Sequence, residues 1–155
     1  MAELWAALES TPIADFFRAS RWGYAGLSAL HILGLAVLFG SVFALSLRLL
    51  GLAKGLARER VIRLLSPLAA SGLMLSLLTG LLLFSARAGE YVNNGAFLVK
   101  LVLIALVTSS ALAAHWRHGL WLERAGEKAS RFHALVSMVG WGLAILAGRL
   151  IAFVD

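Results

Sequence analysis

Four long runs of hydrophobic residues, separated by short polar segments, dominate the pattern along the chain. They cover about residues 22–50, 64–85, 96–114 and 132–154. A helix needs about 20 apolar residues to cross hydrocarbon about 30 Å thick, and each run approaches or exceeds that length. Short connections favour antiparallel packing of consecutive helices. The pattern therefore predicts an all-α integral membrane protein, a four-helix up-down-up-down bundle that forms a single membrane domain over residues 1–155.

The segment before the first run, residues 1–19, has a different character. Trp5 and Leu8 share one face at helical spacing, which predicts a short interfacial helix lying on the membrane surface. Thr11 followed by Pro12 indicates that a second helix starts there. A secretory signal peptide would be basic in this region, whereas acidic residues occupy it, so we expect the segment to remain in the mature protein.

Composition and charge support a membrane location and suggest its orientation. Hydrophobic residues make up 61% of the chain and charged residues only 14%, which is too apolar for a soluble domain. If the first helix runs inward, nine basic residues lie on the inner side and five on the outer side. The positive-inside rule then predicts a multi-pass protein of the bacterial inner (cytoplasmic) membrane with both termini periplasmic. We read the net charge of +6 as a topology and lipid signal and expect no nucleic-acid binding.

Histidines fall inside or at the edges of the hydrophobic runs, whereas every Asp and Glu lies outside them. An ionisable side chain in hydrocarbon is costly and is usually functional. With a rise of about 1.5 Å per residue, His115 and His133 lie at the same depth near the inner surface. His31 lies roughly 20 Å away in depth, so it cannot ligate the same metal. His118, one turn past His115, replaces it if the register is shifted.

Two imidazoles at one depth, beside faces of small residues, match the axial ligands of a b-type haem. The chain has no cysteine, which excludes thiolate metal sites and covalent haem attachment. Arg48 lies at the level of His115, where its planar fork suits a haem propionate, and Arg149 is the charged group nearest in depth to His31. The candidate metal ligands are thus His115, His133 and His31, and the further candidates for cofactor binding are His118, Arg48 and Arg149.

Simpler explanations exist for the same residues. A histidine near a helix end, such as His118 or His133, is often a solvated cap. A single histidine inside the membrane, such as His31, can bond a neighbouring helix. Stripes of small residues are also typical of tight helix packing.

Four short segments carry a resemblance to known families: ALHILG at residues 29–34, GS at 40–41, LRLLG at 47–51 and GRLIAF at 148–153. They resemble a family of small, uncharacterised four-helix bacterial membrane proteins over nearly the whole chain. More remotely, the chain is similar to CopD-type copper-resistance membrane proteins and to membrane b-type cytochromes, which pass electrons between quinol and periplasmic partners. The resemblance implies a four-helix bundle in a bacterial inner membrane, with His31, Arg48 and Arg149 as positions of interest.

Three functions fit these observations. The first is a b-type haem protein, an electron-transfer (oxidoreductase-type) subunit between membrane and periplasmic partners. The second is an accessory subunit of a larger membrane complex without its own chemistry. The third is a copper-handling, CopD-like protein, although soft ligands for a Cu(I) path are scarce. The expected cofactor is haem b, with copper as the alternative, and the expected partners are membrane lipid, other membrane subunits, and a periplasmic redox or copper protein.

Overall fold

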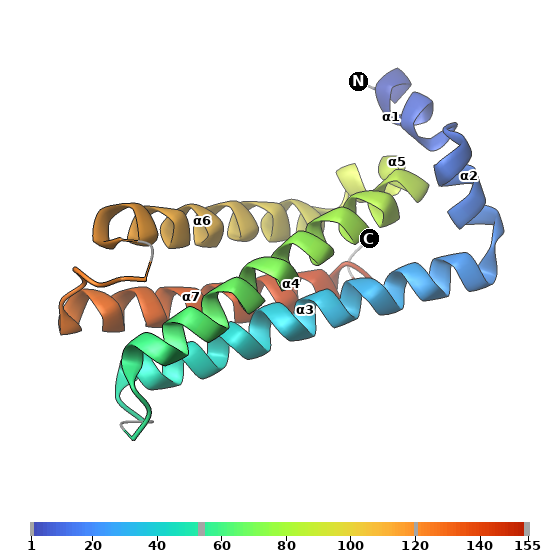
Figure 1. Cartoon of the computed structure of the whole chain (residues 1–155). Coiled ribbons are helices and arrows are strands. Elements are labelled where there is room, and N and C mark those ends of the chain that lie inside the picture. Colours follow the sequence, from blue (N-terminus) through green and yellow to red (C-terminus); the bar gives the residue numbers. More distant parts are fainter. Residues whose placement is uncertain (1, 53–54, 120, 154–155) are drawn as a thin grey trace.

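The computed structural model describes residues 2–52, 55–119 and 121–153. This part of the chain contains four long and three short helices and no strand (Figure 1). In chain order the helices are α1 (Ala2–Glu9), α2 (Pro12–Ala19), α3 (Arg21–Leu50), α4 (Arg58–Ala86), α5 (Ala88–Val92), α6 (Gly95–His118) and α7 (Glu127–Leu150). The all-helical prediction is therefore confirmed for the described residues.

The long helices α3, α4, α6 and α7 are long and apolar enough to cross a membrane. Large hydrophobic side chains cover their outer faces; Leu81 is 65% exposed, Leu106 62% and Leu146 60%. An exposed apolar surface of this extent marks a face that contacts membrane or another protein. Length and composition are therefore those of a multi-pass membrane protein, as the hydrophobic runs predicted.

Several helices extend beyond the predicted hydrophobic runs. α4 begins at Arg58 instead of residue 64, α7 begins at Glu127 instead of 132, and α6 continues to His118 instead of 114. Hydrophobic runs report only the part of a helix that faces hydrocarbon, whereas the backbone ladder continues into the polar interface. In the first turn of α7, Arg131 and Glu127 form an ion pair at 2.5 Å with the spacing of one helical turn. α7 ends at Leu150, and its predicted end at residue 154 lies outside the described residues.

α3 and α7 form the centre of the bundle, because α3 packs along both α4 and α7 while α7 also packs along α6. Throughout the described residues, no Cα atom of α4 comes within 8 Å of one in α6. The expectation that consecutive helices are neighbours thus holds for α3 with α4 and for α6 with α7, but not for α4 with α6. The interposed α5 separates these two helices along the chain, and α3 and α7 take up their packing faces (Figure 1).

The α3–α4 contact is a backbone contact made possible by glycine. A Cβ atom placed on Gly72 would lie 2.8 Å from Gly34 O and 2.9 Å from Leu38 Cα, closer than real Cβ atoms approach. A Cβ on Gly34 would likewise lie 2.9 Å from Ser76 N. Small residues let membrane helices approach in this way. The small residues Gly72 and Ser76 of α4 therefore pack directly against the backbone of α3.

The N-terminal helices pack against the end of the bundle that carries α5 (Figure 1). α2 starts where the sequence predicted, with Thr11 as its N-cap. α1 is held by the Gly89 N–H, which donates to Glu9 Oε1 at 2.7 Å, and by an edge-to-face contact between Trp5 and Phe84 with ring centroids 5.8 Å apart. These contacts connect residues that are distant in the sequence.

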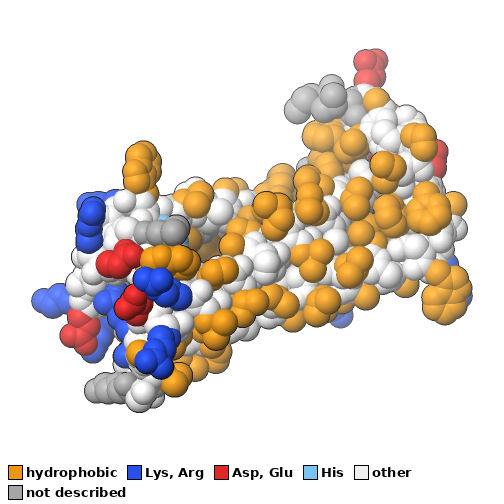
Figure 2. Space-filling view, in the orientation of Figure 1, with side chains coloured by type: hydrophobic (Ala, Val, Ile, Leu, Met, Phe, Trp, Pro, Cys, Tyr) orange, Lys and Arg blue, Asp and Glu red, His pale blue; other side chains and the backbone are white. Residues whose placement is uncertain are grey.

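Charged side chains gather at the opposite end, where the α3–α4 and α6–α7 connections lie (Figure 2). Arg58 organises this end because its guanidinium donates to Ser130 Oγ at 2.7 Å, Ala125 O at 3.2 Å and Leu122 O at 3.3 Å. The Arg58 side chain of α4 thereby holds the α6–α7 connection and the first turns of α7 in place. The two ends of the bundle are therefore chemically different.

Candidate functional site

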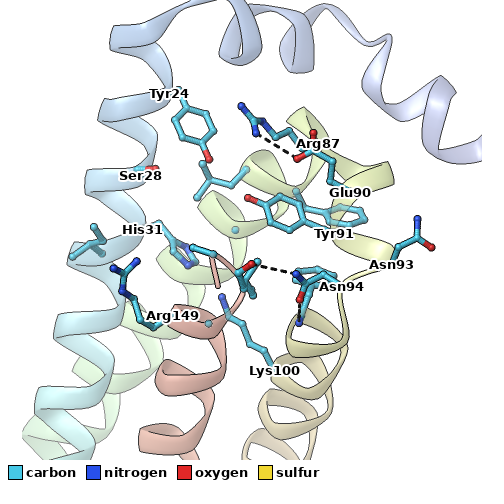
Figure 3. A pocket seen from close by; sticks show the side chains of 18 residues that line it. Tyr24, Ser28, His31, Arg87, Glu90, Tyr91, Asn93, Asn94, Lys100 and Arg149 are labelled. Carbon is cyan, nitrogen blue, oxygen red and sulfur yellow. Dashed lines mark hydrogen bonds and ion pairs between the residues drawn. The ribbon is translucent and has the colours of Figure 1, made fainter. Parts of the chain in front are cut away.

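A cavity of about 780 Å³ lies between the helices at the end that carries α5, and we call it the outer cavity. Residues of α3, α4, α5, α6 and α7 line it, together with the turns that flank α6 and α7 (Figure 3). Its volume falls within the range of about 300–1,000 Å³ that is typical of small-ligand sites. Its polar lining includes His31, Lys100 and Arg149, each on a different one of the four long apolar helices.

His31 is held against α4 by a defined set of contacts. Its Nδ1 atom lies 3.0 Å from Thr79 Oγ1, and Thr79 Oγ1 lies 2.6 Å from the carbonyl oxygen of Leu75. Gly80 leaves room for the ring, because a Cβ atom there would lie 3.1 Å from His31 Cε1. The sequence placed His31 in the outer half of the first span and suggested a bond to a neighbouring helix; the contact is with a threonine on the second span.

Two cationic side chains enter the outer cavity from α6 and α7. The Lys100 side chain runs across Gly148, whose Cβ, if present, would lie 3.3 Å from Lys100 Nζ. The Arg149 guanidinium lies 4.8 Å from the ring centre of Phe153. Within the described residues, neither cation forms an ion pair with a carboxylate. The cavity therefore carries positive charge that these residues leave uncompensated.

An ion pair and two tyrosines also line the cavity. Arg87 Nη1 lies 3.4 Å from Glu90 Oε2, so the Glu90 carboxylate compensates the charge of this cation. Tyr24 and Tyr91 both line the cavity. Burial, with a smaller contribution from Tyr24, raises the pKa of Tyr91 to about 12. Tyr91 is thus a neutral hydrogen-bonding phenol at pH 7.

A smaller cavity of about 200 Å³, the inner cavity, lies among α3, α4, α6 and α7 toward the charged end. His115 and His133, the two histidines predicted to share a haem, both line it, among mainly apolar side chains. His133 Nδ1 is buried and has no hydrogen-bond partner in the described part of the chain. The volume is below the usual range for ligand sites. The structure thus places these two histidines beside one cavity that is small for a haem.

The two remaining predicted residues lie outside both sets of lining residues. His118 packs on His133, with ring centroids 5.9 Å apart. Arg48 Nε donates to Leu56 O at 2.6 Å and so fixes the α3–α4 connection. In the described residues, no group of three or more His, Cys, Asp or Glu side chains is arranged to hold a metal ion.

Sequence reasoning missed Lys100 and the tyrosine pair. Lys100 was counted among the outer basic residues that set the topology, although it lies inside the third hydrophobic helix. A lysine within an apolar span was the available signal, because such a residue is usually functional. Tyr24 and Tyr91 carried no comparable signal, since only folding brings their side chains to one cavity.

Comparisons of the chain with protein-family models, with curated proteins and with solved structures find no match. Function is therefore inferred from the chemistry of the two cavities. The outer cavity combines two cations that form no ion pair within the described ranges with apolar walls that include Phe84, Phe97 and Ile32, whereas the inner cavity is mainly apolar. A ligand that matches the outer cavity has an anionic end and an apolar body.

Proposed function

We propose that this protein binds an amphiphilic anion in the outer cavity. The observation that carries the proposal is the convergence of Lys100 and Arg149 in one cavity between membrane helices, without a carboxylate partner among the described residues. Unpaired charge in such a place is costly, so an anionic ligand that compensates it is stabilised. His31 and the phenol of Tyr91 supply further hydrogen-bonding groups.

We propose for the membrane arrangement an up-down-up-down bundle in the bacterial inner membrane, with the charged end cytoplasmic and both termini periplasmic. The outer cavity then opens toward the periplasmic half, and the N-terminal helices lie in that interface. The absence of cysteine from the chain makes the test direct. Ser10→Cys should react with an impermeant maleimide on intact cells, and Arg124→Cys only after permeabilisation. The opposite labelling pattern would refute this orientation.

Haem b, the cofactor predicted from the sequence, belongs to the class of amphiphilic anions because it carries two carboxylates on an apolar ring. The proposed electron-transfer subunit is therefore one form of this function. The copper-handling alternative has less support, since Lys100 and Arg149 beside His31 repel a metal ion electrostatically. An accessory subunit without ligand chemistry leaves unexplained why the half-buried Lys100 lies in a long apolar helix.

The proposal is tested with dansylaminoundecanoic acid, a fluorescent fatty acid, and with its uncharged methyl ester. We expect saturable binding of the acid to the purified protein and much weaker binding of the ester. Loss of a charge-assisted hydrogen bond costs about 1.5–3 kcal/mol, so Lys100→Met or Arg149→Met should weaken binding of the acid about 10-fold or more.

Lys128→Met is the matched control, because it removes the same charge from an exposed position at the other end of α7. We expect it to bind the acid like the wild type. Equal binding of acid and ester, or equal losses in the Lys100 and Lys128 variants, would refute a specific anion site.

A further inference from the structure

The hydrogen-bond geometry of Thr79 fixes which nitrogen of His31 carries the proton. A hydroxyl group has one hydrogen to donate, and Thr79 directs it to the Leu75 carbonyl oxygen at 2.6 Å. Toward His31 Nδ1, at 3.0 Å, Thr79 Oγ1 therefore acts as the acceptor. The neutral imidazole is then protonated at Nδ1, and its lone pair resides on Nε2.

The packing of the ring directs Nε2 to the outer cavity. The Nδ1 and Cε1 atoms of His31 face Thr79 and Gly80 on α4. The other edge of the ring, with Nε2 and Cδ2, is left for the cavity that His31 lines (Figure 3). Histidines that ligate metals usually donate their second ring N–H to a neighbouring oxygen, which orients the ring. His31 and Thr79 have this arrangement.

A single imidazole does not hold a bare metal ion, because zinc and copper sites use three or four protein ligands. The described residues contain no group of three or more His, Cys, Asp or Glu side chains suited to a metal. A metal at His31 must therefore bring most of its own ligands. A haem does so with four ring nitrogens, and one protein histidine is sufficient to hold it.

We infer that His31 Nε2 is an axial ligand to the iron of a haem-type macrocycle bound in the outer cavity, with Thr79 as the positioning residue. This inference rests on the proposed function, since it names the amphiphilic anion. The macrocycle carries two carboxylates, which match the two cations Lys100 and Arg149 of the outer cavity. The inference differs from the expectation drawn from the sequence, in which His115 and His133 share the iron.

The test compares ferric haem b with metal-free protoporphyrin IX, which has the same ring and carboxylates but no iron. Both are titrated into the purified, cofactor-free protein in detergent. We expect both to bind, with haem at least 10-fold tighter and with the absorption spectrum of a histidine-ligated iron. His31→Gly should lower the affinity for haem to that for protoporphyrin IX and leave protoporphyrin binding unchanged, which also shows that the variant is folded.

Two further measurements separate ligation from a structural role. Added imidazole should restore the ligated haem spectrum in His31→Gly, because it replaces the missing axial ligand. Thr79→Val should weaken haem binding by about 10-fold without affecting protoporphyrin, since removing a partner that orients a metal-ligating histidine typically costs about 10- to 100-fold. His118→Ala, outside the outer cavity, should change neither.

The binding measurements distinguish a wrong axial ligand, a wrong cavity and a wrong proposed function. If neither porphyrin binds, the inference is wrong, and absence of dansylaminoundecanoic acid binding as well would refute the proposed function. If both porphyrins bind equally and His31→Gly leaves the haem spectrum unchanged, only the axial-ligand assignment is wrong. If ligation persists in His31→Gly but is lost in His115→Ala or His133→Ala, the iron lies at the inner cavity and the inference is refuted.

Discussion

The contact between α3 and α4 at Gly72 leads to a sharp prediction about stability. In Gly72→Ala, the new Cβ would lie 2.8 Å from Gly34 O and 2.9 Å from Leu38 Cα, which are both backbone atoms and cannot rotate away. Ordinary contact begins at 3.4 Å, and the backbone nitrogen of Leu38 lies even closer to the new Cβ than these two atoms, so the two helices must separate by more than about 0.6 Å at this point. Overpacking of this kind costs about 1–3 kcal/mol.

Gly40→Ala is the matched control, because no atom lies within 4 Å of a Cβ built at Gly40 on α3. Both substitutions gain about 1 kcal/mol of helix propensity, so the difference between the variants isolates the clash. In reversible unfolding by SDS, followed by helical circular dichroism, the unfolding free energy of Gly72→Ala should lie about 1–3 kcal/mol below that of Gly40→Ala. Equal unfolding free energies would refute the backbone contact.

Two further predictions concern the ends of the bundle. Burial raises the pKa of Tyr91 to about 12. The stability that its neutral phenol contributes is therefore complete below pH 10 and is lost as the pH rises toward 12. An ultraviolet titration should show a late phenolate step that disappears in Tyr91→Phe, and a wild-type titration without this late step would contradict the prediction. Arg58→Lys loses the forked contacts to the α6–α7 connection and should lower the unfolding free energy by about 1–3 kcal/mol. The exposed Arg60 offers the control, and similar effects of Arg58→Lys and Arg60→Lys would show that the forked contacts contribute nothing.

Helix content and approximate span positions could be predicted from hydrophobicity because crossing hydrocarbon requires long apolar helices. The helix ends were displaced by several residues, as at Arg58 and Glu127, because charged first turns are helical but not apolar. Thr11 was found as an N-cap from its local chemistry alone. The sequence therefore revealed those features that depend on residues close together in the chain.

The site depended on contacts between residues that are distant in the chain. The helical rise per residue predicted that His115 and His133 lie at the same depth, and the two side chains line one cavity. Depth alone does not give the size of that cavity, and it does not show that Lys100 and Arg149 lie in one cavity with His31. Lateral distances between helices follow from which faces pack, and packing is decided by backbone approach at a few glycines.

An all-helical chain with four long apolar helices and histidines within its hydrophobic runs follows from the order of residues alone. The central position of α3 and α7, the separation of α4 from α6, and the shared cavity of His31 and the two cations follow from the packing of the folded chain. The physical reason is that hydrophobicity sets how each helix lies relative to the membrane, whereas close packing of small residues sets how the helices lie relative to one another.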